Sequence, residues 1–172
     1  AGSDEDRYRE LKEALLEPDA APLWFVRGGY GSGRLLPYLE RDFPSPPPQV
    51  RPVLGCSDTT FLLLFMLQRW NWVVFHSPMP AGDLSRGKDA FDATYLFDLL
   101  QGRPVRGSVS PGPMTVIRGG PEVSAPLTGG CLSILAATLG TPWEWQTEGK
   151  ILFIEETAEK PFRLDRMLTQ LR

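Results

Sequence analysis

The segment that most constrains the fold connects an apolar pair, Val53-Leu54, to an apolar run at residues 61–67. The six residues between them are small or polar, Gly-Cys-Ser-Asp-Thr-Thr at positions 55–60. This pattern predicts a short strand that ends with the apolar pair, a helix that begins near Thr59, and a sharp turn between them that carries Ser57. In an α/β fold, such a turn can expose a nucleophilic oxygen at the head of a helix, where backbone N–H groups can bind a developing oxyanion.

The turn by itself allows two interpretations. Its position resembles a nucleophile elbow, although Thr59 stands where the Gly-x-Ser-x-Gly pattern has its second glycine. A serine or aspartate just before an apolar helix is also a common N-cap, with no role in chemistry. The residues of the turn leave both open, so the neighbouring segments have to decide.

Short apolar runs alternate with helical patterns through the first hundred residues. The sequence predicts strands at residues 23–26, 50–54 and 73–75, and helices at residues 5–16, 32–39, 59–70 and 90–100. This alternation favours a parallel sheet with flanking helices, a Rossmann- or flavodoxin-like α/β domain. Ligands bind such sheets beyond the carboxyl ends of the strands, and Arg27, Ser57 and His76 all fall there.

The character of the sequence changes after Gly102. Gly and Pro are frequent at residues 105–120, and beyond them the patterns predict a helix at 132–139, an apolar buried strand at 151–154 and a helix that begins at Met167. We expect an N-terminal domain at residues 1–104, a linker at 105–110 and the first part of a smaller β-rich C-terminal domain at 111–172. There is no initiator methionine and the last residues are helical in pattern, so we expect an internal piece of a longer protein.

Composition argues against several classes of function. The net charge is −3 with no basic run, which argues against a nucleic-acid partner. No apolar run approaches the length of a membrane span, and the first ten residues are acidic and polar where a leader peptide would be apolar. The two cysteines, Cys56 and Cys131, lie in Gly-containing turns without the spacing of a disulfide framework or a metal site. We expect a reducing, cytoplasmic location.

Three further segments, in chain order, carry a resemblance to a known family. They are Arg-Gly-Gly-Tyr-Gly at residues 27–31, Gly-Gly-Cys-Leu-Ser at 129–133, and a stretch at 149–171 that contains Ile-Leu-Phe-Ile-Glu-Glu and Arg-Met-Leu-Thr-Gln-Leu. Together with the Gly-x-Ser-Asp turn, they resemble the LD-carboxypeptidases, a family of serine peptidases that includes muramoyltetrapeptide carboxypeptidases and microcin-immunity peptidases. The resemblance covers nearly the whole chain.

The resemblance implies cleavage of the bond between an L-configured centre and a terminal D-amino acid, usually release of D-alanine from murein tetrapeptides in peptidoglycan recycling. It assigns Ser57 as the nucleophile and Glu155, rather than Glu156, as the acid of a Ser-Glu-His triad. The family's histidine would lie beyond Arg172, so the isolated chain should be inactive. The N-terminal domain would lack its first strand and helix. No metal or organic cofactor is implied.

The resemblance also suggests the substrate-binding groups. Backbone N–H groups of Gly29 or Tyr30 and of Asp58 are candidate oxyanion donors. Arg27 is the nearest candidate for the substrate's free carboxylate, because a guanidinium can bind it in bidentate fashion. His76, the one histidine of the chain, would line the site without being the general base. The glycine spacing of the loop does not match the dinucleotide fingerprint.

The sequence departs from the family pattern at three positions, of which Cys56 and Cys131 could alter substrate fit. Cys56 stands where the family usually has an aromatic residue, Cys131 where it often has asparagine, and Ser77 where it has glycine. Two alternatives stay open: a microcin-immunity-type peptidase that cleaves a peptide–nucleotide toxin, and a non-catalytic α/β binding module. The expected partner is a small peptide, and homodimer formation is left open.

Overall fold

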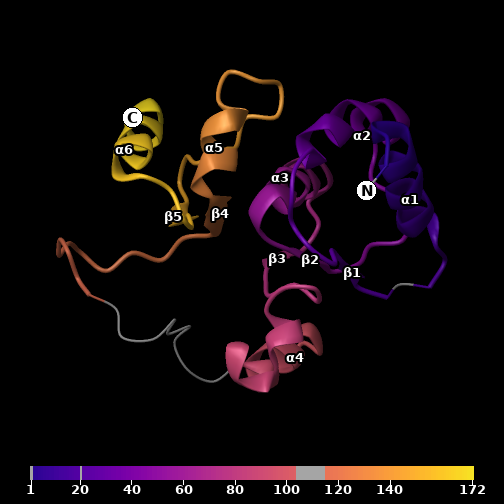
Figure 1. Ribbon diagram of the computed structural model, residues 1–172, viewed down its shortest axis with the longest axis horizontal. Helices are drawn as coiled ribbons and strands as arrows, with labels where there is room; N and C mark the ends of the chain where they lie inside the picture. Colours follow the sequence, from indigo (N-terminus) through magenta and orange to yellow (C-terminus); the bar gives the residue numbers. More distant parts are fainter. Residues whose placement is uncertain (1, 20, 104–114) are drawn as a thin grey trace.

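The computed structural model describes residues 2–19, 21–103 and 115–172. The first part of the chain forms a parallel sheet of three strands in the order β1-β2-β3, namely β1 (Leu23–Trp24), β2 (Val53–Gly55) and β3 (Val74–His76) (Figure 1). In the register, Trp24 pairs with Leu54 and Gly55 with His76. The α/β fold class with parallel strands and flanking helices is therefore confirmed, with β1 and β2 shorter than predicted.

Helices precede, connect and follow these strands, in the alternation that the sequence predicts. They are α1 (Asp4–Leu16), a 3₁₀ turn η1 (Ser32–Leu35) that continues into α2 (Leu36–Asp42), a second 3₁₀ turn η2 (Ser57–Thr59) that continues into α3 (Thr60–Trp70), two short 3₁₀ turns η3 (Leu84–Arg86) and η4 (Lys88–Ala90), and α4 (Ala93–Leu100). Ser3 caps α1 by accepting a hydrogen bond from the N–H of Asp6. This cap explains why the helix begins where it does.

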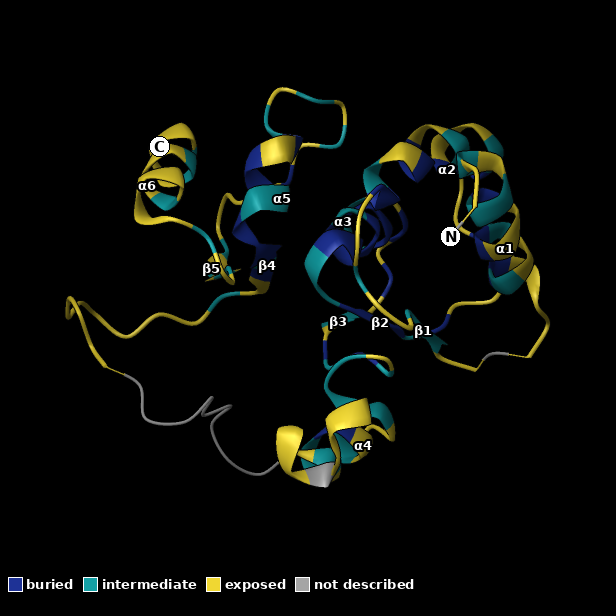
Figure 2. Ribbon diagram, in the orientation of Figure 1, coloured by how far each residue is buried: buried dark blue, intermediate teal, exposed yellow. Residues whose placement is uncertain are grey.

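Helix α3 is buried between two groups of apolar side chains (Figure 2). On one side it contributes to the main core of α1, α2 and the first sheet, where Leu15, Leu39 and Met66 are fully buried. On the other side Leu64 packs with Leu135 and Trp145 from the second part of the chain. A helix that is covered on both sides needs apolar residues around its circumference, which accounts for the uninterrupted run at residues 61–67.

The second part of the chain contains two parallel strands, β4 (Leu127–Cys131) and β5 (Ile151–Glu155), and two helices, α5 (Leu132–Thr138) and α6 (Pro161–Gln170). The strand β4 replaces the turn that its two glycines suggested, so that prediction was wrong. A Cβ on Gly129 would lie 1.7 Å from the backbone oxygen of Phe153 on β5. The glycine is required for the close approach of the two strands, and not for a turn.

Two further predictions about this part were wrong. Helix α6 begins at Pro161 rather than Met167, in keeping with the preference for proline in the first turn of a helix. The run at residues 151–154 is not buried, since Ile151, Leu152 and Ile154 are 38–48% exposed. The predicted linker at 105–110 lies outside the described residues, so the domain limits stay a prediction. Among the described helices, none is both long and apolar enough to cross a membrane.

Candidate active site

The turn after β2 holds Ser57 in a backbone conformation that serine rarely adopts. Its φ is 58°, and among the described residues only Asn71 and Ala158 share a positive φ without being glycine. Asn71 is the C-cap of α3, a common place for this conformation, but Ser57 caps nothing. A residue held in the left-handed region stores about 1–3 kcal/mol of strain, and such residues cluster at active sites. The geometry is that of a nucleophile elbow.

The N-cap interpretation of this turn is wrong. Neither η2 nor α3 has a side-chain hydrogen bond at its N-terminus, and the Asp58 carboxylate is turned toward another segment. The Thr59 hydroxyl donates to the carbonyl of Cys56 at 2.7 Å and so closes the turn locally. A Cβ on Gly55 would lie 2.4 Å from that hydroxyl oxygen. The Thr59 side chain therefore fits only because residue 55 is glycine.

The glycine-rich loop between β1 and η1 passes directly over Ser57. A Cβ on Gly28 would lie 2.9 Å from both Cβ and Oγ of Ser57, so only glycine allows this approach. Gly29 and Gly31 have φ values of 115° and 100°, in the left-handed region that favours glycine. Gly28 thus places the backbone of the loop against the half-buried Ser57.

Tyr30 and Arg27 lie at the exposed part of this loop. Tyr30 is 81% exposed, and the guanidinium carbon of Arg34 lies 5.3 Å from the centre of its ring. Arg27 and Tyr30 line a cavity of about 650 Å³ between the loop, α1 and β1. Neither Ser57 nor Glu155 lines that cavity, so the contact of Arg27 with a substrate at Ser57 stays a prediction.

Glu155 and His76 face each other across the two sheets. Nε2 of His76, the last residue of β3, lies 3.6 Å from Oε1 of Glu155, the last residue of β5. The distance is beyond a hydrogen bond but within the range of an ion pair. Burial lowers the pKa of His76, and burial together with the nearby charge of Glu156 raises the pKa of Glu155. The His76 ring packs edge-on against Phe153 with the ring centres 4.9 Å apart.

The neighbouring Glu156 has a different environment. Its Oε2 accepts the backbone N–H of Ser133 at 2.9 Å, at the first turn of α5, and lies 3.6 Å from Sγ of Cys131. Burial opposes its ionisation, but hydrogen bonds from the N–H groups of Ser133 and Thr157 outweigh burial, so the pKa of Glu156 is lowered. The Glu155 carboxylate thus faces His76 with its charge disfavoured, whereas the Glu156 carboxylate is bound by backbone donors.

Both cysteines of the chain, Cys56 and Cys131, are free thiols. Burial, and then the charges of Asp83 and Glu155, raise the pKa of Cys56 to about 11, so the thiol stays protonated at neutral pH. A protonated thiol is a poor nucleophile, so Cys56 is a weak candidate for the nucleophile of this turn. Cys131 donates its backbone N–H to the hydroxyl of Thr60 at 3.4 Å. No group of metal-ligating side chains occurs in the part of the chain that the structure describes.

Sequence reasoning missed two residues that shape the site. Ser32 and Thr60 each hold another segment in place, through contacts with Asp58 and Cys131. No local pattern identifies them, because their partners are 26 and 71 residues away in the sequence.

The sequence matches known proteins along both parts of the chain. A profile of the LD-carboxypeptidase N-terminal domain matches residues 1–77, and a profile of the LD-carboxypeptidase C-terminal domain matches residues 124–172. The chain belongs to the LD-carboxypeptidase family. The resemblance carried by the loop and strand motifs is thereby confirmed.

Individual relatives agree with this assignment. The probable murein peptide carboxypeptidase of Bacillus subtilis is 35% identical over 176 residues, which cover 100% of this chain and 53% of the relative. The murein tetrapeptide carboxypeptidase of Pseudomonas aeruginosa is 32% identical over 180 residues, which cover 99% of this chain and 57% of the relative. The crystal structure of muramoyltetrapeptide carboxypeptidase from Oxalobacter formigenes superposes with a TM-score of 0.76 at 32% identity. The superposition covers 99% of this chain and 57% of that structure.

A more distant relative represents the second branch of the family. The microcin C7 self-immunity protein MccF of Escherichia coli is 25% identical over 201 residues, which cover 100% of this chain and 57% of MccF. The chain spans little more than half the length of the relatives described here.

Proposed function

We propose that this chain carries the nucleophile and the acid of a serine carboxypeptidase that removes the terminal D-alanine of murein tetrapeptides. The observation that carries the proposal is Ser57, held at φ 58° between β2 and α3 with the backbone of Gly28 against its hydroxyl. Family membership and the names of the relatives from Bacillus and Pseudomonas support the substrate class.

In the proposed mechanism, Oγ of Ser57 attacks the carbonyl carbon of the scissile bond while a histidine takes its proton. The oxyanion binds to the N–H of Asp58 and to the N–H of Gly29 or Tyr30. The bond to D-alanine then breaks, the histidine returns the proton to the leaving amine, and water hydrolyses the acyl-enzyme by the same route. Glu155 orients the histidine and stabilises its charged form.

The family pattern assigns the general base to a histidine beyond Arg172, and not to His76. The isolated 172-residue chain should therefore release no D-alanine, because loss of a general base typically costs about 10²- to 10⁴-fold in rate. Incubation of the isolated chain with murein tetrapeptide tests this. Turnover that disappears in His76→Ala would instead make His76 the base.

The nucleophile is tested in the complete gene product. Ser57→Ala should abolish D-alanine release and leave tetrapeptide binding, measured by calorimetry, nearly unchanged. Ser85→Ala is the matched control, because Ser85 is exposed and its hydroxyl bonds only the carbonyl of Gly82. Undiminished release by Ser57→Ala would remove Ser57 from the mechanism.

The relationship to MccF supports a second candidate, the cleavage of a peptide–nucleotide toxin. Solved structures of MccF include a complex with aspartyl sulfamoyl adenosine, at 21% identity to this chain. The loops at the strand ends, rather than the triad, should distinguish the two substrate classes, and the departures from the family pattern at Cys56 and Cys131 could alter substrate fit there. Comparison of kcat/KM for murein tetrapeptide and for aspartyl sulfamoyl adenosine decides between them, since the proposed carboxypeptidase should prefer the tetrapeptide.

A further inference from the structure

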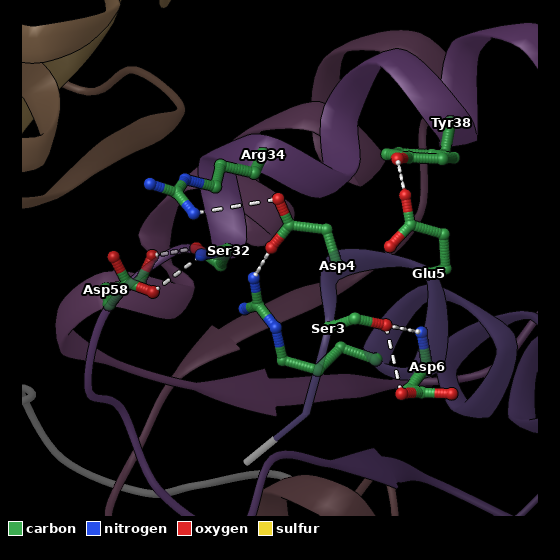
Figure 3. Close-up of polar contacts among 9 residues, drawn as sticks. Ser3, Asp4, Glu5, Asp6, Ser32, Arg34, Tyr38 and Asp58 are labelled. Atoms are coloured by element: carbon green, nitrogen blue, oxygen red, sulfur yellow. Dashed lines mark hydrogen bonds and ion pairs between the residues drawn. The ribbon is translucent and has the colours of Figure 1, made fainter.

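A buried carboxylate that the proposed mechanism does not use connects the two segments around Ser57. Asp58 and Ser32 are 8% and 5% exposed. Oδ2 of Asp58 accepts the backbone N–H of Ser32 at 2.8 Å, and the Ser32 hydroxyl donates to the backbone carbonyl of Asp58 (Figure 3). Two reciprocal hydrogen bonds thus join the residue after the nucleophile to the end of the glycine-rich loop.

The opposite side of the loop is held by charged side chains nearer the surface. A Cβ on Gly31 would lie 3.0 Å from the Arg7 guanidinium, and Arg7 forms an ion pair with Asp4. The second carboxylate oxygen of Asp4 lies 3.6 Å from Arg34 (Figure 3). The guanidinium of Arg34 also lies over the ring of Tyr30. The pair of Arg7 and Asp4 is only part-buried and the Arg34 side chain is 58% exposed, and ion pairs near the surface contribute little. The hydrogen bonds between Asp58 and Ser32 are buried, and a buried group that loses its partner is strongly destabilising, so these bonds are a firm constraint on the loop.

The position of the loop matters because an oxyanion needs two donors from different segments. One candidate donor is the N–H of Asp58 and the other belongs to Gly29 or Tyr30. Both must lie about 2.7–3.1 Å from a single oxygen for the transition state to be stabilised. Gly28 packs so near Ser57 that a Cβ there would lie 2.9 Å from Oγ, so the position of the loop backbone against Ser57 is sensitive to any shift.

We propose that the Asp58 carboxylate is a positioning residue that fixes the glycine-rich loop over Ser57 and so sets the spacing of the oxyanion donors. This inference rests on the proposed function. The carboxylate acts through the loop, and it does not touch the substrate. Its effect depends on an acceptor oxygen at the right place more than on its charge.

Kinetics of three variants of the complete gene product test the inference with murein tetrapeptide as the substrate. Asp58→Ala removes the acceptor and leaves the N–H of Ser32 buried without a partner. This variant should lower kcat about 100-fold with little change in KM. A loss of this size is expected when the oxyanion donors of the loop are misplaced by about 1 Å. Asp58→Asn keeps an acceptor oxygen of the same shape and should stay within about 10-fold of wild type. Ser85→Ala is the control and should leave kcat and KM unchanged, because Ser85 is exposed and its hydroxyl bonds only the carbonyl of Gly82.

Circular dichroism establishes the folded fraction of each variant, so that kcat refers to folded protein. If Asp58→Ala does not fold, Asp58→Thr replaces it, because the threonine hydroxyl is one bond too short to reach the N–H of Ser32. Wild-type kcat in the Ala or Thr variant, with Ser57→Ala inactive, overturns the inference and leaves the proposed function standing. An equal loss of kcat in Asp58→Asn also overturns it, because Asn retains the acceptor.

A second measurement separates this inference from the proposed function. Amide hydrogen exchange reports the loop directly and needs no turnover. Exchange at Ser32 and Gly31 should be faster in Asp58→Ala than in wild type and close to wild type in Asp58→Asn. If wild type releases no D-alanine, the proposed function is refuted, and equal exchange in all three proteins would then refute the positioning role as well.

Discussion

The two adjacent glutamates at the end of β5 should respond to the same substitution in opposite ways. Side chains alternate along a strand, so Glu155 and Glu156 lie in different environments. Glu155 faces His76 with a pKa that burial raises, whereas Glu156 accepts the N–H of Ser133 and has a lowered pKa. Replacement by glutamine keeps the shape of each side chain and removes its charge.

For activity, the larger effect should come from Glu155→Gln. The proposed role of Glu155 is to hold the histidine and stabilise its positive charge, and the corresponding loss in a Ser-His-Asp triad lowers the rate about 10⁴-fold. Glu156→Gln should change kcat much less, because Gln can still accept the N–H of Ser133. The assay couples released D-alanine to D-amino acid oxidase in the complete gene product.

For stability, the order should reverse. A carboxylate whose folded pKa is raised is disfavoured in its charged form, so above that pKa its ionisation lowers the free energy of unfolding. Glu155→Gln removes this penalty and should leave stability unchanged or higher at pH 7. Glu156→Gln weakens a charge-assisted bond at a helix N-terminus and should cost about 1 kcal/mol, measured by urea unfolding. A greater loss of kcat in Glu156→Gln would show that the strand is assigned one residue out of register.

Three further outcomes are expected. Gly28→Ala should lower kcat at least about 100-fold, because its Cβ would lie 2.9 Å from Oγ of Ser57, while Gly119→Ala, with open space around it, should have no effect on D-alanine release. Ser57→Gly should be inactive and yet about 1 kcal/mol more stable in urea unfolding, because glycine adopts a positive φ without strain. The pKa of His76 is lowered in the folded state, so the contribution of His76 to stability is present above the unfolded pKa of about 6.5 and is lost as the pH falls below it. His76→Gln should therefore flatten the decline in unfolding free energy below that pH. An unchanged slope of unfolding free energy against pH would contradict this.

Much of the first sheet could be predicted because its signals are local. The apolar pair before Gly55 and the apolar run after Thr60 indicate a strand and a helix whatever else the chain does, and the turn between them follows. The environment of the turn could not be predicted in the same way. Whether Asp58 caps α3 or binds Ser32 depends on a segment 26 residues away. A cap and a long-range acceptor have the same local sequence.

The strand β4 shows the opposite problem, in which a local signal is strong and misleading. Two adjacent glycines indicate a turn, yet Gly129 lies inside a strand because Phe153 of β5 approaches its backbone too closely for any side chain. Similarly, the apolar residues at 151–154 suggested burial, but three of their side chains are exposed on this chain. In both cases the deciding factor is what packs against the strand, which a single segment does not encode.

The candidate site owes its position to the carboxyl ends of parallel strands from two separate sheets. Ser57 follows β2, His76 ends β3 and Glu155 ends β5, so each side chain is placed by a backbone that is fixed by its ladder. Between the sheets, the 3.6 Å approach of His76 to Glu155 and the 3.4 Å bond from Cys131 to Thr60 set how the two ends face each other. A substitution that moves one sheet against the other should therefore change the relation of Ser57 to Glu155 without altering either strand.

The departures from the family pattern at Cys56 and Cys131 lie at this junction, one beside the nucleophile and one at the end of β4. Restoring asparagine at position 131 should consequently act on the choice of substrate more than on the fold, since the Cys131 N–H that bonds Thr60 belongs to the backbone and is kept.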